Sequence, residues 1–121
     1  MTADELGLRT KHFALRIIKL VAALPKAIEG RAIANQLVRC GTSAAANDRA
    51  ACRARSRTEF IAKMGVVLEE ADEAQPWLEL IIDSKLLPKK QVQSLHAQAT
   101  ESVAIFVASR KSASSNLRSS I

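Results

Sequence analysis

The sequence predicts an all-α fold, an antiparallel up-down-up-down four-helix bundle, and three observations support this prediction. The 121 residues suit a single domain, and 48% of them are apolar, which is enough for a packed core. The composition is rich in Ala, Leu, Arg, Lys and Glu, the residue types that favour helices. Apolar residues recur at spacings of three and four along four stretches of chain. The breaks between these stretches are short, and short connections place successive helices antiparallel.

The first helix is expected over residues 3–24. Its apolar side chains fall on one helical stripe, at spacings of four, three, one and three residues: Phe13, Ile17, Leu20, Val21 and Leu24. Pro25 disfavours helical backbone in the residue before it and should end this helix. The second helix is expected to open after Gly30 and to run to about Ala54. Within it, the small residues of the run 41–43 (GTS) would let a neighbouring helix pack closely.

The third helix is expected to begin at a capping box. In the run 56–59 (SRTE), the Ser hydroxyl and the Glu carboxylate would both accept hydrogen bonds from otherwise unpaired backbone N–H groups. Pro76 lies inside this helix and should kink or interrupt it. The apolar positions form a bundle seam with a strict 4-3 spacing over three heptads: Phe60, Met64, Val67, Ala71, Ala74, Leu78 and Ile81.

The fourth helix is expected to begin near Pro88, a residue that suits the first helical position. Its inward side chains would be Val92, Leu95, Ala99, Val103 and Phe106. After Arg110 the chain becomes Ser-rich. We therefore expect one domain over residues 1–112 and a flexible tail over residues 113–121.

Charge is segregated along the chain. The net charge of +6 divides into +2 for residues 1–30, +5 for 31–58, −6 for 59–84 and +5 for 85–121. The second predicted helix is therefore basic and the third acidic. A basic surface of this kind suits a polyanionic partner.

Arginines form a stripe on the second predicted helix. At 100° per residue, four of them fall within an arc of about 80° opposite the apolar side: Arg31, Arg39, Arg49 and Arg53. Arginine binds phosphate through two parallel N–H groups, so a stripe of this kind predicts contact with nucleic acid. The candidate contacts, including the following turn and later basic residues, are Arg31, Arg39, Arg49, Arg53, Arg55, Arg57, Lys89, Lys90, Arg110 and Lys111.

Two alternatives remain for the Arg stripe. It is either a solvated face, or it meets the acidic third helix of a neighbouring subunit in an oligomer. In the second case the interface candidates are Trp77, Glu69 and Glu73. Interfacial arginines would be buried and paired, whereas arginines that bind nucleic acid would remain exposed.

The sequence is not expected to encode an enzyme, and no cofactor or metal is expected. It contains no Gly-rich phosphate loop, no HExxH motif and no Ser/His/Asp set. A di-iron bundle needs Glu-x-x-His pairs, and neither His12 nor His96 has a Glu three residues before it. Cys40 and Cys52 would lie about 18 Å apart on one helix, so they cannot bridge and are interpreted as small apolar fillers.

No stretch of the chain predicts contact with a membrane. None approaches the ~18–20 consecutive apolar residues of a membrane span, and the polar first residues lack the apolar run of a signal peptide. A cytoplasmic location is therefore expected.

Three linked motifs resemble those of one protein family. The run 36–47 (QLVRCGTSAAAN) resembles the QLxRSGTSIxAN signature of small bacterial four-helix proteins, a group named after intervening sequences of 23S ribosomal RNA. The run 55–64 (RSRTEFIAKM) is similar to the family's ARSKxDFIxKM, and the run 71–80 is similar to EAxETxYWLxLL. Together the resemblance covers roughly residues 9–110. Cys40 replaces the usual Ser, and Gln75-Pro76 replaces a plain helical pair.

This resemblance implies a four-helix bundle that assembles as a homopentameric ring without enzymatic activity. Relatives of the family include the accessory variability protein of diversity-generating retroelements, a basic pentamer suited to hold RNA or DNA and to bind a reverse transcriptase. Thr42, Ser43 and Asn47 match motif positions of structural character. The resulting hypothesis is a basic oligomeric scaffold that binds RNA or DNA through its Arg-rich face. The alternative is a protein-interaction module whose Arg stripe lies at subunit interfaces.

Overall fold

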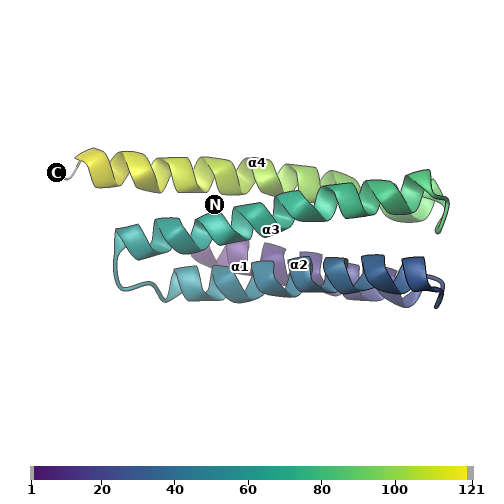
Figure 1. Ribbon diagram of the computed structural model, residues 1–121. Coiled ribbons are helices and arrows are strands. Elements are labelled where there is room, and N and C mark those ends of the chain that lie inside the picture. The colour runs from purple at the N-terminus through teal and green to yellow at the C-terminus, as the bar shows by residue number, and fades with distance from the viewer. Residues whose placement is uncertain (1, 120–121) are drawn as a thin grey trace.

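The computed structural model describes residues 2–119, with side chains described through residue 115, and these residues form four helices. They are α1 (Ala3–Ala22), α2 (Ile28–Cys52), α3 (Arg57–Asp83) and α4 (Lys89–Ser119). The helices run antiparallel in one elongated bundle, with no strand among the described residues (Figure 1). The predicted all-α fold with four helices is confirmed.

The first two helices are set by local features. The Thr2 hydroxyl oxygen accepts a hydrogen bond from the Glu5 backbone N–H at 3.1 Å and caps α1. α2 begins at Ile28, so the expectation that it opens after Gly30 is wrong by about one turn. Gly30 lies in the first turn of α2 because the helix passes against the Pro25 carbonyl, where a Cβ would overlap the oxygen. The glycine therefore marks a close approach of backbone to backbone.

The predicted cap of α3 is present, with one difference in detail. The Ser56 hydroxyl accepts from the Glu59 N–H at 3.1 Å, whereas the Glu59 carboxylate accepts from the N–H of Arg55 at 3.3 Å, one residue earlier than a capping box requires. α3 then continues without interruption through Pro76, which is exposed. It ends where Lys85 adopts a positive φ of 60°, which allows the Leu86 N–H to bond the Ile81 carbonyl at 3.1 Å.

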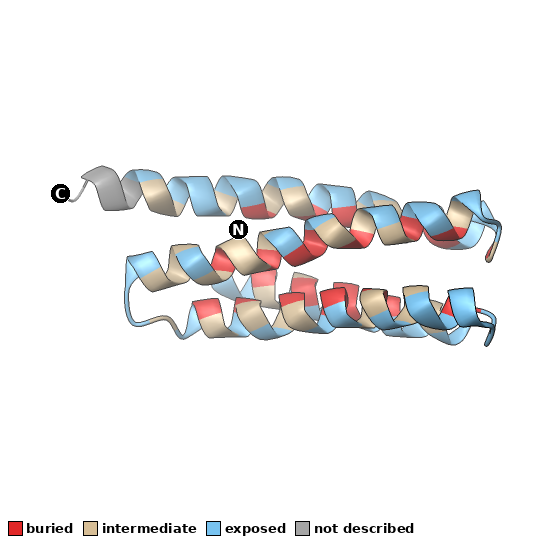
Figure 2. Ribbon diagram, in the orientation of Figure 1, coloured by how far each residue is buried: buried red, intermediate tan, exposed pale blue. Residues whose placement is uncertain are grey.

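The core lies along the inner faces of the helices, as the buried residues show in Figure 2. Of the seven seam positions predicted on α3, all except Phe60 are buried. Gly41 brings α2 close to α1, because a Cβ there would lie 3.0 Å from Ile17 Cδ1 and 3.3 Å from Ala14 Cα. This confirms the close-packing role expected for the GTS run.

The bundle is less tightly closed between its first and last helices. α1 and α4 make far fewer contacts than the three pairs of successive helices. Their shared seam is polar: Arg9 Nε donates to the buried Ser102 hydroxyl at 3.1 Å, and Arg16 donates to Ser94 at 3.2 Å. These polar bonds join α1 to α4, in addition to the apolar side chains that both helices contribute to the core.

α4 extends past residue 112, at which the domain was expected to end. The sequence predicts a flexible tail from residue 113, but α4 continues to Ser119, and residues 120–121 lie outside the described residues. The Ser-rich segment contains neither Pro nor Gly. Helix propagation from a formed helix fixes only one residue for each hydrogen bond gained, so this segment can extend α4. None of the described helices is long and apolar enough to span a membrane.

Candidate nucleic-acid interface

Arg39 is bound by carboxylates of its own chain. Its Nη1 donates to both carboxylate oxygens of Glu70, at 2.9 and 3.1 Å, and its Nη2 pairs with Glu73. Glu73 also accepts from the Trp77 indole at 3.4 Å and from the Cys40 thiol at 3.1 Å. We call these five side chains the Arg39 cluster. It ties the middle of α2 to the middle of α3.

The Arg39 cluster makes Cys40 an unreactive thiol. Burial and the neighbouring Glu73 carboxylate raise the pKa of Cys40 to about 12, so the thiol stays protonated near neutral pH. The hydrogen bond from this thiol in turn lowers the pKa of Glu73. Ligand atoms of Cys40, Glu70 and Glu73 lie within 4.8 Å of one another, close enough for a metal ion. The Arg39 guanidinium, however, occupies the carboxylates that such an ion would need.

Six other predicted contacts gather at one end of the bundle, which we call the basic end. There α2 ends, α3 begins, and the later turns of α4 run alongside them (Figure 1). Arg110 Nε donates to the Ile61 carbonyl at 3.1 Å, which fixes α4 against the start of α3. None of the six side-chain cations lies within 4.0 Å of a carboxylate among the described residues. The Glu59 carboxylate is bonded to the backbone N–H of Arg55 and not to its guanidinium. All six are exposed: Arg49, Arg53, Arg55, Arg57, Arg110 and Lys111.

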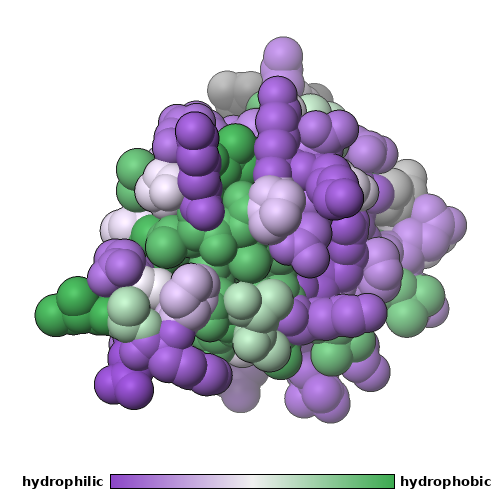
Figure 3. All heavy atoms as spheres, turned by 90° about the vertical axis from the view of Figure 1, so that its right-hand side faces the viewer, coloured by the Kyte–Doolittle hydropathy of each residue, from purple (hydrophilic) through white to green (hydrophobic). Residues whose placement is uncertain are grey.

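The remaining three candidates, Arg31, Lys89 and Lys90, lie at the opposite end. They are exposed at the end that carries the α1–α2 and α3–α4 connections, where apolar atoms lie at the centre and hydrophilic side chains around them (Figure 3). With a rise of 1.5 Å per residue, Arg31 lies about 33 Å along α2 from Arg53. The single stripe inferred from angular position is therefore divided along the helix axis.

The three residues expected at an oligomer interface have different surroundings in the structure. Glu73 and Trp77 belong to the Arg39 cluster and contact each other within the chain. Glu69 is exposed on α3. Of these three residues, Glu69 is thus the one whose side chain is mainly available to another molecule.

A buried carboxylate that the sequence analysis did not single out lies between α1 and α2. Asp48 is only 2% exposed, and burial raises the pKa of its carboxyl, an effect that Thr10 partly offsets. Gly7 of α1 lies beside this side chain, and a Cβ there would be in ordinary contact with Asp48 Oδ2, at 3.5 Å. The sequence held the signal: on a helical wheel Asp48 falls on the same side as the apolar Ala44 and Ala51.

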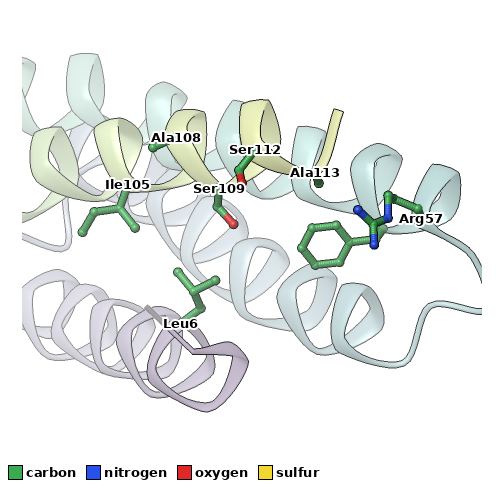
Figure 4. Close-up of a pocket in the computed structure, with 8 residues that line it drawn as sticks. Leu6, Arg57, Ile105, Ala108, Ser109, Ser112 and Ala113 are labelled. Atoms are coloured by element: carbon green, nitrogen blue, oxygen red, sulfur yellow. The ribbon is translucent and has the colours of Figure 1, made fainter. Parts of the chain in front are cut away.

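A hollow adjoins the basic end, and sequence reasoning missed it. It has a volume of about 750 Å³ and lies between the start of α1, the start of α3 and the later turns of α4 (Figure 4). We call it the end hollow. It exists because α1, with 20 residues, is shorter than α3 with 27 and α4 with 31. Its lining consists of Leu6, Arg57, Phe60, Ile105, Ala108, Ser109, Ser112 and Ala113.

Comparison with known proteins identifies the family. The family model described as 23S rRNA-intervening sequence protein matches residues 8–108. The chain belongs to this family. A crystal structure at 1.70 Å of a protein with unknown function, from the S23 ribosomal protein family of Bacteroides thetaiotaomicron, is 31% identical to it. The two superpose with a TM-score of 0.82, over 92% of this chain and 99% of that one. None of the curated proteins matches the sequence.

The family resemblance seen in the sequence now has a structural explanation in this chain. Arg39 and Cys40 come from the first matched motif, and Glu73 and Trp77 come from the third, and all four belong to the Arg39 cluster. Asn47, also in the first motif, donates to the Ser43 carbonyl at 2.9 Å, a local bond of the kind expected. The motif residues of the Arg39 cluster therefore hold α2 against α3. The exposed arginines of the basic end lie mostly outside the motifs.

Proposed function

We propose that this protein is a non-enzymatic, oligomeric scaffold that binds RNA or DNA through phosphate contacts at the basic end. The observation that supports it most is the gathering there of six exposed cations without carboxylate partners among the described residues. Residues 49–58, at the centre of this surface, contain four arginines and no acidic residue. Arginine is the side chain best suited to bidentate contact with phosphate.

Binding of this type has a distinct salt dependence. Each phosphate contact with duplex nucleic acid releases counterions and steepens the dependence of log K on log salt by about 0.9. A surface that acts mainly through phosphates therefore binds many sequences and loses affinity quickly as salt rises. Within this proposal, the scaffold presents nucleic acid to a second protein, such as a reverse transcriptase.

Self-association is part of the same proposal, with a homopentameric ring as the assembly. Leu8, Leu15 and Ile18 are 69%, 55% and 46% exposed, and their spacing of seven and three places them on one face of α1. An apolar stripe of this kind supports packing against another copy of the chain. Five copies of a chain with net charge +6 would concentrate positive charge around one ring.

A second candidate function is an assembly module in which arginines bind the α3 helix of the next subunit. The pairing of Arg39 with Glu70 and Glu73 favours it, because it shows that α2 arginines and α3 carboxylates match in geometry. Glu69 and Asp72, both exposed on α3, would be the acceptors for a neighbouring subunit. High salt would then dissociate the oligomer, whereas in the first function it would release only the nucleic acid.

A charge-reversal pair tests the proposed function. Arg55→Glu with Arg57→Glu alters the basic end, and Lys89→Glu with Lys90→Glu is a matched control at the opposite end. Each pair lowers the net charge by the same amount at the start of a helix, where acidic residues are tolerated. Binding of a fluorescein-labelled duplex RNA is measured by anisotropy over a range of salt concentrations, with light scattering to follow the oligomer.

The basic-end pair is expected to lower the slope of log K against log salt by about two, one for each lost contact, while the control pair leaves the slope close to wild type. Equal losses in both pairs would mean that total charge, and not the basic end, governs binding. If wild-type protein fails to bind RNA or DNA even at low salt, the nucleic-acid proposal is wrong. Salt-induced dissociation of the oligomer would then favour the assembly module.

A further inference from the structure

The end hollow combines the three kinds of group that recognise a nucleotide. Its volume of about 750 Å³ falls within the range of about 300–1,000 Å³ typical of small-molecule sites. Phe60 and Ile105 supply apolar surface, and Ser109 and Ser112 supply hydroxyl groups that both donate and accept hydrogen bonds. Arg57 adds a cation (Figure 4). No carboxylate is among the described residues that line the hollow.

Phe60 differs from the other aromatic residues of the chain. Phe13 and Phe106 are each only 2% exposed, and the Trp77 indole is engaged with Glu73. Phe60 is half-buried and is the one α3 seam position that the other helices leave partly uncovered. An aromatic ring is therefore open to a ligand at the end of the bundle where the exposed arginines gather.

We propose that the end hollow takes up the base of an unpaired nucleotide, which stacks on Phe60 while Arg57 binds the adjoining phosphate. This inference rests on the proposed function and deepens it. The Ser109 and Ser112 hydroxyls lie where they can bond the polar edge of the base, an edge that a paired base does not offer. Arg57 is the cation that lines the hollow, and its charge matches that of a phosphate next to the base. The exposed Arg53, Arg55 and Arg110 belong to the same end of the bundle, where they would contact phosphates farther along the strand.

This inference changes the expected mode of binding. The low aromatic content of 3% predicts binding directed to the backbone, with little contribution from base stacking and little sequence specificity. A single ring next to the phosphate-binding arginines is enough to create a preference for bulges, loops and single strands. Stacking of one base on an aromatic side chain changes affinity by about 5- to 150-fold in other proteins.

The test compares two RNA molecules that differ by one nucleotide. One is a blunt duplex, and the other is the same duplex with a single bulged 2-aminopurine, a base whose fluorescence is quenched when it stacks. Wild-type protein is expected to bind the bulged RNA at least 5-fold more tightly and to quench the probe. Phe60→Leu keeps most of the apolar volume and removes the ring. It is expected to abolish this preference while leaving the affinity for the blunt duplex unchanged.

Two controls separate this inference from the proposed function. Phe13→Leu makes the same chemical change at a buried position and should retain the preference for the bulge. Arg55→Glu with Arg57→Glu should lower the affinity for both RNA molecules. Circular dichroism and light scattering establish that each variant keeps the fold and the oligomer.

Each outcome decides the matter. If Phe60→Leu retains the preference, or if wild-type protein does not quench 2-aminopurine, the inference is wrong, although the proposed function stands as long as the blunt duplex still binds. If neither RNA binds, both fail together. If Phe60→Leu changes the oligomeric state instead of the preference, the end hollow is a contact between copies of the chain. If the variant does not fold, quenching by the wild-type protein alone decides.

Discussion

Gly30→Ala provides a sharp test of how α1 turns into α2. In an ordinary helix this change stabilises the folded state by about 0.5–1 kcal/mol, because alanine loses less backbone entropy than glycine. Here the new Cβ would overlap the Pro25 carbonyl oxygen and lie 3.1 Å from the carbonyl carbon. Both are backbone atoms and cannot rotate away, so the start of α2 must move.

Overpacking of this kind costs about 1–3 kcal/mol, and the backbone contact places this case in the upper part of that range. After subtracting the gain expected from alanine, the net loss in the free energy of unfolding is about 1–2 kcal/mol. For a chain of this size, that loss lowers the midpoint of thermal unfolding by about 4–8 °C.

The assay is thermal and urea unfolding followed by circular dichroism, at one fixed protein concentration because self-association shifts the midpoint. Gly7→Ala is the matched control. It is also a helical glycine, but a Cβ there meets only Asp48 Oδ2, at an ordinary contact distance of 3.5 Å. This control is expected to raise the free energy of unfolding by about 0.5–1 kcal/mol. A Gly30→Ala protein as stable as wild type would refute the close approach to Pro25.

Two further predictions concern buried titratable groups. At pH 8, a thiol reagent should modify only the exposed Cys52 of the folded chain, because burial and Glu73 raise the pKa of Cys40 to about 12. Rapid modification of both thiols without denaturant would contradict this prediction. Asp48→Asn should raise the free energy of unfolding at pH 7. Burial raises the pKa of the Asp48 carboxyl in the folded state above its value in the unfolded chain. As the pH rises from below the unfolded-state pKa to above the folded-state pKa, ionisation of Asp48 therefore lowers the free energy of unfolding. In urea titrations the gain should vanish at low pH, where both states are protonated, and a gain independent of pH would argue against this origin.

The regular features of the fold could be predicted because they depend on local chemistry. The period of the apolar residues on α3 identifies six of its seven seam positions as buried, and Ser56 marks the start of that helix correctly. The ends of elements were harder to predict. Gly30 resembles a break in the sequence but lies within α2, and the Ser-rich segment after residue 112 continues α4.

The candidate site could be predicted only in part, because a helical wheel gives the direction of a side chain and not its neighbours. It places Arg39 correctly on the stripe of Arg49 and Arg53, but the carboxylates of α3 pair with Arg39 alone among the three. It also gives no sign that α1 is too short to cover Phe60. That opening depends on the relative lengths and ends of three helices.

The sequence by itself determined the four helices, their inward faces and the excess of arginine on α2, since these follow from spacing and composition within short segments. The tertiary structure alone decided which charges remain available. Arg39 and Glu73 are 34 residues apart in the chain and meet because α2 and α3 pack side by side in one register. The same packing leaves the basic end without carboxylate partners among the described residues and opens the end hollow beside it. Pairing between distant segments depends on the register of whole helices, which no local pattern encodes.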